Sequence, residues 1–169
     1  MKKLLCIFLI ISLVLPLWGC QEEPPTYKNP VNFYYPKVTP SFGAEDSLIA
    51  IELAEGDGFQ NDTINLLNAY IQGPKTEDFR NIFPTGTKVL ALTIKDGIAI
   101  LQVNKYFADL TGLNLSIACA CLTLTVMDLT GAETVHISAK HANLDGKEMI
   151  VMDRNNLTLL DLYIPEPTE

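Results

Sequence analysis

Two cysteines separated by one residue, Cys119 and Cys121, come closest in this sequence to the spacing of a metal or redox site. They lie in an apolar stretch, Ser116–Leu129, whose length favours a helix. On a helix, positions i and i+2 point about 200° apart, so the two thiols can neither share a metal ion nor form a disulfide with each other. Only a β-strand would place both on one face. We therefore expect two small, buried and unreactive side chains in a tightly packed helix.

The two histidines, His136 and His141, are five positions apart, across a predicted strand and its end. Their side chains therefore tend toward opposite faces, and we expect both at the surface. No Glu or Asp stands at the spacing of a His-Glu-x-x-His zinc site, and the Gly-x-Ser-x-Gly and Ser-x-x-Lys strings of serine hydrolases are absent. The sequence thus predicts no catalytic residue, no metal site and no cofactor, which argues against an enzyme.

An acidic cluster of Glu55, Asp57 and Asp62 has some of the oxygen ligands that calcium prefers. It lacks the bidentate Glu that closes a twelve-residue calcium loop. We expect a solvated turn that leads into a helix, and we interpret the polar segment 153–161 in the same way.

The N-terminus has the layout of an export signal. Two lysines precede the 14-residue run Leu4–Leu17, which is shorter than the roughly 20 apolar residues that span a membrane. The next residues, Leu17-Trp18-Gly19-Cys20, resemble the bacterial lipobox. This resemblance implies that Cys20 carries a diacylglyceryl group and begins the mature chain, anchored at the outer face of the cytoplasmic membrane. An ordinary secreted protein in which Cys20 is incidental is the alternative.

The composition predicts one compact domain behind this leader. Of the 169 residues, 48% are hydrophobic and 19% are charged, which excludes general disorder. We divide the chain into a signal peptide (1–19), a lipidated cysteine with a Pro-rich tether (20–30), a folded domain (31–163) and a disordered tail (164–169). The net charge of -8 has the wrong sign for nucleic acid or anionic head groups, so neither is expected to be bound by charge.

The first half of the folded part contains two strand signals and one helix signal. β-Favouring residues predict strands over Val31–Tyr35 and Ser47–Leu53. Asp62 is a typical N-cap for a helix that continues to Gln72 and stops at Gly73-Pro74.

The second half opens with a hairpin, because Asp96-Gly97 is the signature of a tight type I′ turn. Gly131 is expected to end the helix that follows. The elements expected from the hairpin onward are the strands Thr87–Ile94 and Ile98–Val103, the helix Ser116–Leu129, and the strands Thr134–Lys140 and Glu148–Asp153. The order strand-helix-hairpin-helix-strand predicts an α+β fold in which two helices cover one face of a mixed β-sheet.

Three consecutive aromatic residues, Phe33, Tyr34 and Tyr35, are the best candidates for a binding determinant. They could form an exposed contact patch for a partner, or they could cover the open end of the core.

Several local sequences agree with one known family. The most specific piece is the helix end Gly73-Pro74 followed ten residues later by Pro84-Thr85-Gly86-Thr87, and the Asp96-Gly97 hairpin and the apolar Cys-Leu-Thr-Leu-Thr helix accompany it. Over roughly residues 45–150 the chain resembles the GerMN domain of sporulation and spore germination proteins and of other lipoproteins of Gram-positive bacteria. The resemblance implies a small domain related to the ring-building domains of secretion and sporulation machinery, without catalytic residues.

We therefore expect a membrane-anchored, non-catalytic assembly or interaction module. Its partner would be an envelope or sporulation protein, or a second copy of the chain. The alternative is a lipoprotein that binds a small ligand or cell-wall fragment between its sheet and its helices.

Overall fold

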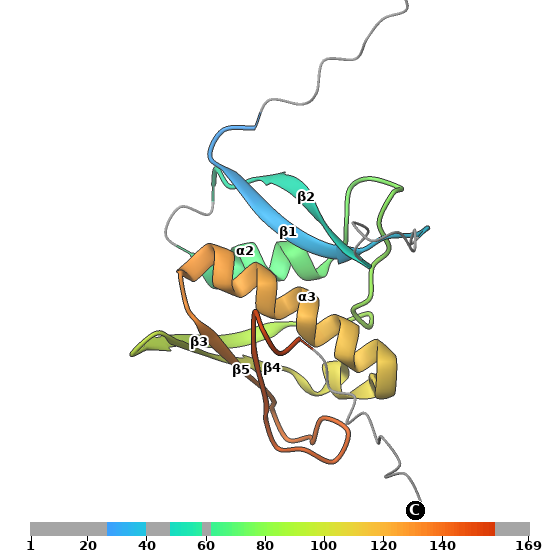
Figure 1. The fold of residues 1–169 in the computed structure, drawn as a ribbon, viewed down its shortest axis with the longest axis vertical. Coiled ribbons are helices and arrows are strands. Elements are labelled where there is room, and N and C mark those ends of the chain that lie inside the picture. Colours follow the sequence, from blue (N-terminus) through green and yellow to red (C-terminus); the bar gives the residue numbers. More distant parts are fainter. Residues whose placement is uncertain (1–26, 40–47, 59–61, 158–169) are drawn as a thin grey trace, which may run out of the picture.

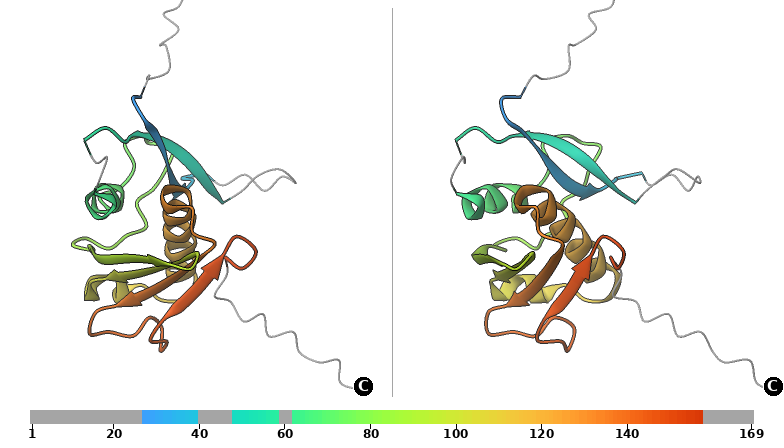
Figure 2. Two further views of the ribbon diagram at one scale, coloured as in Figure 1. Left: turned by 90° about the vertical axis from the view of Figure 1, so that its left-hand side faces the viewer. Right: turned by 60° about the vertical axis from the view of Figure 1, so that its left-hand side comes forward.

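The fold consists of three layers (Figures 1 and 2). The computed structural model describes residues 27–39, 48–58 and 62–157. A two-stranded ribbon lies on one side, two α-helices lie in the middle, and a four-stranded sheet lies on the other side. The buried apolar side chains of all three layers form one core.

The ribbon consists of β1 (Pro30–Pro36) and β2 (Ile49–Glu55), which run antiparallel with Tyr34 opposite Ile51. Both predicted strands are thus confirmed, although Ser47 lies outside the described residues. The second edge of β1 faces helix α3 (Gly112–Thr130), where the backbone N–H of Tyr34 donates to Thr125 Oγ1 at 3.1 Å. A helix therefore borders β1 where a third strand could have paired.

Helix α2 (Thr63–Ile71) has the cap that the sequence predicts. The Asp62 carboxylate accepts a hydrogen bond from the backbone N–H of Asn65 at 2.9 Å, which pairs one of the free N–H groups of the first turn. Gly73 follows the helix with a φ of +113°, a conformation that favours glycine.

The predicted hairpin is also confirmed. Strands β3 (Val89–Lys95) and β4 (Ile98–Val103) pair antiparallel around Asp96 and Gly97, whose φ angles of 52° and 76° fit a type I′ turn. Near the other end of the pair, the Asn68 side chain of α2 binds both the N–H and the C=O of Val89, at 2.9 and 3.2 Å.

A short 3₁₀ helix, η2 (Lys105–Asp109), leads into α3 and was not expected from the sequence. Helix α3 starts at Gly112, four residues before the expected start at Ser116. Its N-cap residue, Thr111, makes no side-chain capping hydrogen bond, so the usual signature of a helix start is missing. The end is as predicted, because Gly131 adopts φ 70° and its N–H donates to the carbonyl of Met127.

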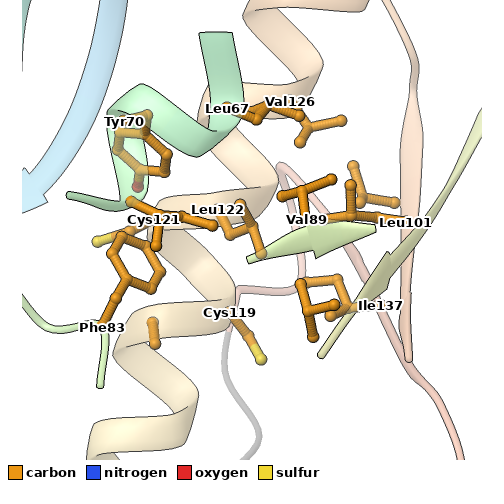
Figure 3. Close-up of a cluster of buried hydrophobic side chains, with 14 of the residues drawn as sticks. Leu67, Tyr70, Phe83, Val89, Leu101, Cys119, Cys121, Leu122, Val126 and Ile137 are labelled. Carbon is orange, nitrogen blue, oxygen red and sulfur yellow. The ribbon is translucent and has the colours of Figure 1, made fainter. Parts of the chain in front are cut away.

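Helix α3 is the centre of the core. It is long and apolar enough to cross a membrane by length and composition alone, but 67% of its 18-residue apolar window is buried within the domain. It packs against β1 on one side and against β4, β5 (Thr134–Ala139) and β6 (Ile150–Asp153) on the other. Figure 3 shows its side chains Cys119, Leu122 and Val126 among residues of α2 and the sheet.

The single mixed sheet expected from the sequence is wrong, because the strands form two separate sheets. The larger sheet has the order β3-β4-β5-β6 and is mixed, since β4 and β5 are parallel whereas the two outer pairs are antiparallel. The alternation of apolar residues shows which face of a strand is buried, but it does not identify the neighbouring strand. The ribbon buries its inner face against the helices and therefore stands apart from the main sheet.

Candidate interaction surface

The predicted leader, residues 20–26 of the Pro-rich tether and, among these, the lipid attachment residue Cys20 lie outside the described residues. The whole predicted tail, residues 164–169, and Asp161 lie outside them as well. The described residues begin in the tether, three residues before β1.

The exposed aromatic patch expected as one alternative is wrong for Phe33 and Tyr35. Phe33 is 6% exposed and Tyr35 is fully buried. Their rings pack against Tyr70 of α2, with centroids 5.0 and 4.9 Å away. The Tyr35 hydroxyl donates to the carbonyl of Tyr70 at 2.6 Å, and the Tyr70 hydroxyl donates to the carbonyl of Tyr34 at 2.7 Å. These two aromatics therefore cover the core, and burial raises the pKa of both Tyr35 and Tyr70.

Tyr34 points the other way and takes part in a polar network on the side of α3. Its hydroxyl donates to Asp128 Oδ2 at 2.7 Å, and Asn32 Nδ2 donates to the same oxygen at 3.1 Å. Arg154, in the turn after β6, forms an ion pair with the other carboxylate oxygen of Asp128. The network connects the ribbon, the core helix and the end of the sheet, so Tyr34 has a structural role.

The two cysteines are buried and free, as the sequence predicts. Figure 3 shows them on different sides of α3, with Cys121 toward Tyr70 and Phe83 and Cys119 away from these rings. Burial raises the pKa of the Cys119 thiol, and it raises the pKa of Cys121 to about 12. Both thiols are therefore protonated near neutral pH and are poor nucleophiles and poor metal ligands.

The acidic cluster serves local structure. Asp62 caps α2, while Glu55 accepts the backbone N–H of Lys28 and Asp57 accepts Asn29 Nδ2 in the segment that leads into β1. Among the residues that the structure describes, no group of three or more His, Cys, Asp and Glu side chains could hold a metal ion.

An open surface of regular structure is the face of the four-stranded sheet that points away from α3. On β4, Ala99, Leu101 and Val103 are buried against the core, so Ile98, Ile100 and Gln102 point outward. We call the outward residues of the four strands the open sheet face; they are Ala91, Thr93, Lys95, Ile98, Ile100, Gln102, Thr134, His136, Ser138, Val151 and Asp153. No described α-helix covers this face (Figures 1 and 2).

The centre of the open sheet face is a row across all four strands. Thr93 lies opposite Ile100, Ile100 beside His136, and His136 opposite Val151. Ile100 and Val151 are each 45% exposed. The row contains no carboxylate and no Lys or Arg, whereas the chain as a whole has a net charge of -8. The neighbouring row, Lys95–Ile98–Thr134–Asp153, carries one charge of each sign. A partly apolar row without Asp, Glu, Lys or Arg at the centre of a sheet face is suited to contact with another protein surface.

Sequence reasoning found the strands of this face but not the face itself. The alternation over 134–140 indicates that Thr134, His136 and Ser138 point away from the core. It does not show which strands lie beside them, so the meeting of Ile100 and Val151 around His136 could not be predicted.

The fold and this surface define an α+β domain with one covered and one open sheet face. A family model for sporulation and spore germination proteins, named Germane, matches residues 32–145. This chain belongs to that family.

Solved structures of the family share the fold. The first GerMN domain of the sporulation protein GerM from Bacillus subtilis superimposes with a TM-score of 0.57 at 15% identity, over 78% of this chain and 98% of that domain. The tandem GerMN domains of the same protein give a TM-score of 0.56 at 15% identity, over 79% of this chain and 49% of that structure. The GerMN-type domain expected from the sequence is thus confirmed. No curated protein matches the chain.

Proposed function

We propose that this protein is a lipid-anchored, extracytoplasmic assembly module that binds another envelope protein through the open sheet face. The observation that carries the proposal is the uncharged row Thr93–Ile100–His136–Val151 on a face that no described α-helix covers. Membership in a family of sporulation and spore germination proteins supports a role in an envelope complex. The Gly19-Cys20 pair at the end of the apolar leader supports the lipid anchor.

A non-catalytic role is consistent with the chemistry of the described residues. Both cysteines are buried and protonated, and the described carboxylates form no cluster that could hold a metal ion. The proposed partner is a protein with a complementary uncharged surface, because the acidic chain repels anionic partners.

The experiment is chemical crosslinking in cells that carry a tagged full-length chain, followed by affinity purification and mass spectrometry. The test variant is Ile100→Asp, which places a charge at the centre of the open sheet face. The matched control is Ile51→Asp on the outer side of β2, because Ile51 and Ile100 are equally exposed, at 46% and 45%.

We expect the wild type and Ile51→Asp to recover a defined envelope or sporulation protein and Ile100→Asp to lose it. Cys20→Ala should reduce recovery by releasing the anchor. Recovery of only the chain itself would identify self-association. Equal recovery with both Asp variants would contradict the proposed surface, and recovery of nothing above background would contradict the assembly role.

A further inference from the structure

The ribbon of β1 and β2 has one free edge. Figure 1 shows β1 between β2 and α3, and among the described strands β2 pairs only with β1. At one end of the ribbon the N–H of Gly56 donates to the carbonyl of Asn29 at 3.1 Å. At the other end the N–H of Lys37 donates to the carbonyl of Leu48 at 3.0 Å. Bonded pairs alternate along an antiparallel ladder, so the even-numbered residues of β2 direct their backbone groups toward β1.

The backbone groups of Ile51 and Leu53 therefore point away from β1, into the free edge. The same alternation on β1 directs the N–H of Tyr34 away from β2, where it reaches Thr125. Within the described residues, no hydrogen bond uses the N–H or C=O groups of Ile51 and Leu53. Their side chains lie on the outer face of the ribbon and are 46% and 51% exposed. The edge thus offers backbone donors and acceptors beside two apolar side chains.

The outer strands of the larger sheet have features that oppose pairing with a further strand. Strand β3 has a bulge between Val89 and Ala91 and ends at Lys95, and β6 has only four residues. Bulges, lysines and short strands protect sheet edges against pairing with another chain. Strand β2 has seven residues without Lys or Pro, and it pairs with β1 in an unbroken register. Of the described edges, that of β2 is therefore the best suited to accept another strand.

A second copy of the chain fits this edge. Two β2 edges related by a two-fold axis run antiparallel, so each copy supplies the donors and acceptors that the other needs. With Leu53 on the axis, the two Leu53 side chains lie opposite each other, and Ile51 lies opposite Glu55 of the second copy. Glu52 then lies opposite Ala54, so this register does not oppose the two Glu52 carboxylates.

The charge of the chain does not oppose this pairing locally. Glu55 is the one charged side chain among the outward residues of β1 and β2, and its carboxylate accepts the N–H groups of Lys28 and Asp57. Salt screens charges that lie more than about 8 Å away. A tether of ten residues, from Cys20 to Pro30, would hold every lipid-anchored copy within about 35 Å of one membrane surface, which raises the effective concentration of a second copy.

We propose that this protein forms a two-fold symmetric dimer in which the two β2 strands pair antiparallel, with Leu53 at the axis. The backbone groups of Ile51, Leu53 and Glu55 connect the copies, and the two Leu53 side chains pack together on the outer face. A two-stranded ribbon is marginally stable alone, and the dimer converts it into a four-stranded sheet. The open sheet face lies on the other side of the helices, so it stays free in both copies.

Co-isolation of two differently tagged full-length copies from the same cells tests this dimer. Leu53→Asp in both copies, or Leu53→Lys in both, places like charges opposite each other at the axis. We expect each variant to reduce co-isolation about fivefold or more relative to the wild type. Ile100→Asp, at a residue of the open sheet face that is 45% exposed, is the matched control and should co-isolate like the wild type.

A charge exchange tests the register of the two strands. With Leu53→Asp in one copy and Leu53→Lys in the other, opposite charges meet at the axis, and we expect co-isolation to return. Damage to the fold by either substitution would not be repaired by the other. The melting temperatures of the purified variants should stay near that of the wild type, because Leu53 is half exposed on the outer face.

Disulfide formation in membranes tests direct contact and serves if the charged variants do not fold. Directly paired residues have Cα atoms about 5.5 Å apart, which is within the range of a disulfide, so Leu53→Cys should form a covalent dimer on mild oxidation. Ile51→Cys is the control, because the two substituted positions would lie four residues out of register, at least about 13 Å apart. Cys119 and Cys121 are buried and should not form a covalent dimer under the same conditions.

Three results would overturn the proposal. They are a wild type that does not co-isolate with itself, equal co-isolation by the wild type and Leu53→Asp, and co-isolation that Ile100→Asp removes but Leu53→Asp does not. A covalent dimer from Ile51→Cys and none from Leu53→Cys would overturn the pairing at Leu53. The dimer does not depend on the proposed function. Leu53→Asp should recover the same envelope protein as the wild type in the crosslinking experiment, so the two proposals fail separately.

Discussion

The ribbon and the four-stranded sheet lie on opposite sides of the helices, and they are attached to them by different kinds of contact. The inner face of the sheet is aliphatic, with Leu101, Val103, Val135 and Ile137 all fully buried. The inner face of the ribbon carries aromatic rings and the buried carboxylate Glu52, all of which make directional contacts. A two-stranded sheet has little area to bury, so hydrogen bonds and ring contacts supplement its packing.

Glu52 illustrates the attachment of the ribbon. It is 6% exposed, and it accepts hydrogen bonds from the backbone N–H groups of Lys75 and Thr76, each at 2.9 Å, and from the Thr76 hydroxyl at 3.0 Å. Buried carboxylates of this kind need several donors. Polar groups thus hold the ribbon to the loop after α2, whereas the sheet relies on aliphatic packing.

The largest effect should come from Tyr35→Ala in the ribbon. The substitution removes a fully buried ring that contacts Tyr70, and it removes the donor to the Tyr70 carbonyl. We expect a loss of about 3–5 kcal/mol in the free energy of unfolding, measured by urea denaturation. Ile51→Ala on the exposed side of the ribbon is the control. A loss below about 1 kcal/mol for Tyr35→Ala would mean that the ribbon is not an integral part of the fold.

Glu52→Gln tests the polar part of that attachment. The amide keeps the shape but replaces one acceptor oxygen with a donor that faces backbone N–H groups. We expect a loss of about 1–3 kcal/mol in urea denaturation. Glu77→Gln, at an exposed position of the neighbouring loop, should change little. If the two variants were equally stable, the carboxylate would have no special role.

Asp128 should make the connection between ribbon and sheet sensitive to acid. Burial by itself raises the pKa of Asp128, but hydrogen bonds from Tyr34, Asn32 and Arg154 outweigh it and hold the pKa below its ordinary value. The stabilisation is therefore complete above the pKa of an unfolded aspartate, about 3.9, and is lost as the pH falls through the lower folded pKa.

The measurement is the difference in unfolding free energy between the wild type and Asp128→Asn at a series of pH values. We expect the wild type to be more stable at pH 7 and the difference to shrink below about pH 4. Tyr34→Phe removes one hydrogen-bond donor to the Asp128 carboxylate. In this background we expect Asp128→Asn to cause a smaller loss of stability at pH 7. A difference that stays constant down to pH 2 would show that the ionised carboxylate does not stabilise the network.

The smallest effect on stability should come from the open sheet face. Ile100→Thr keeps a β-branched residue on β4 and exposes no core atom, so we expect a change within about 0.5 kcal/mol. Leu101→Ala, at the adjacent but fully buried position, should cost about 2–5 kcal/mol. Similar costs for the two variants in thermal denaturation would indicate that the face is packed against something in the free protein.

Local signals in the sequence were sufficient for most of the elements. Asp62 as a cap, Asp96-Gly97 as a turn and Gly131 as a helix end each involve only neighbouring residues, and the structure confirms them. The start of α3 was missed because Thr111 makes no capping hydrogen bond. The helical period alone predicts that the two cysteines point in different directions, and the apolar stretch around them predicts their burial.

The sequence by itself determined the family, the α+β class, the main strands and helices, and the absence of any familiar catalytic motif, because these depend on residue types and short spacings. Only the tertiary structure decided that the strands form two sheets, that Phe33 and Tyr35 face the core, and that Ile100 and Val151 share an open face. The physical reason is that each of these features depends on which distant segment covers a given face. Apolar alternation specifies that a face is covered, but the covering element is selected by packing across the whole domain.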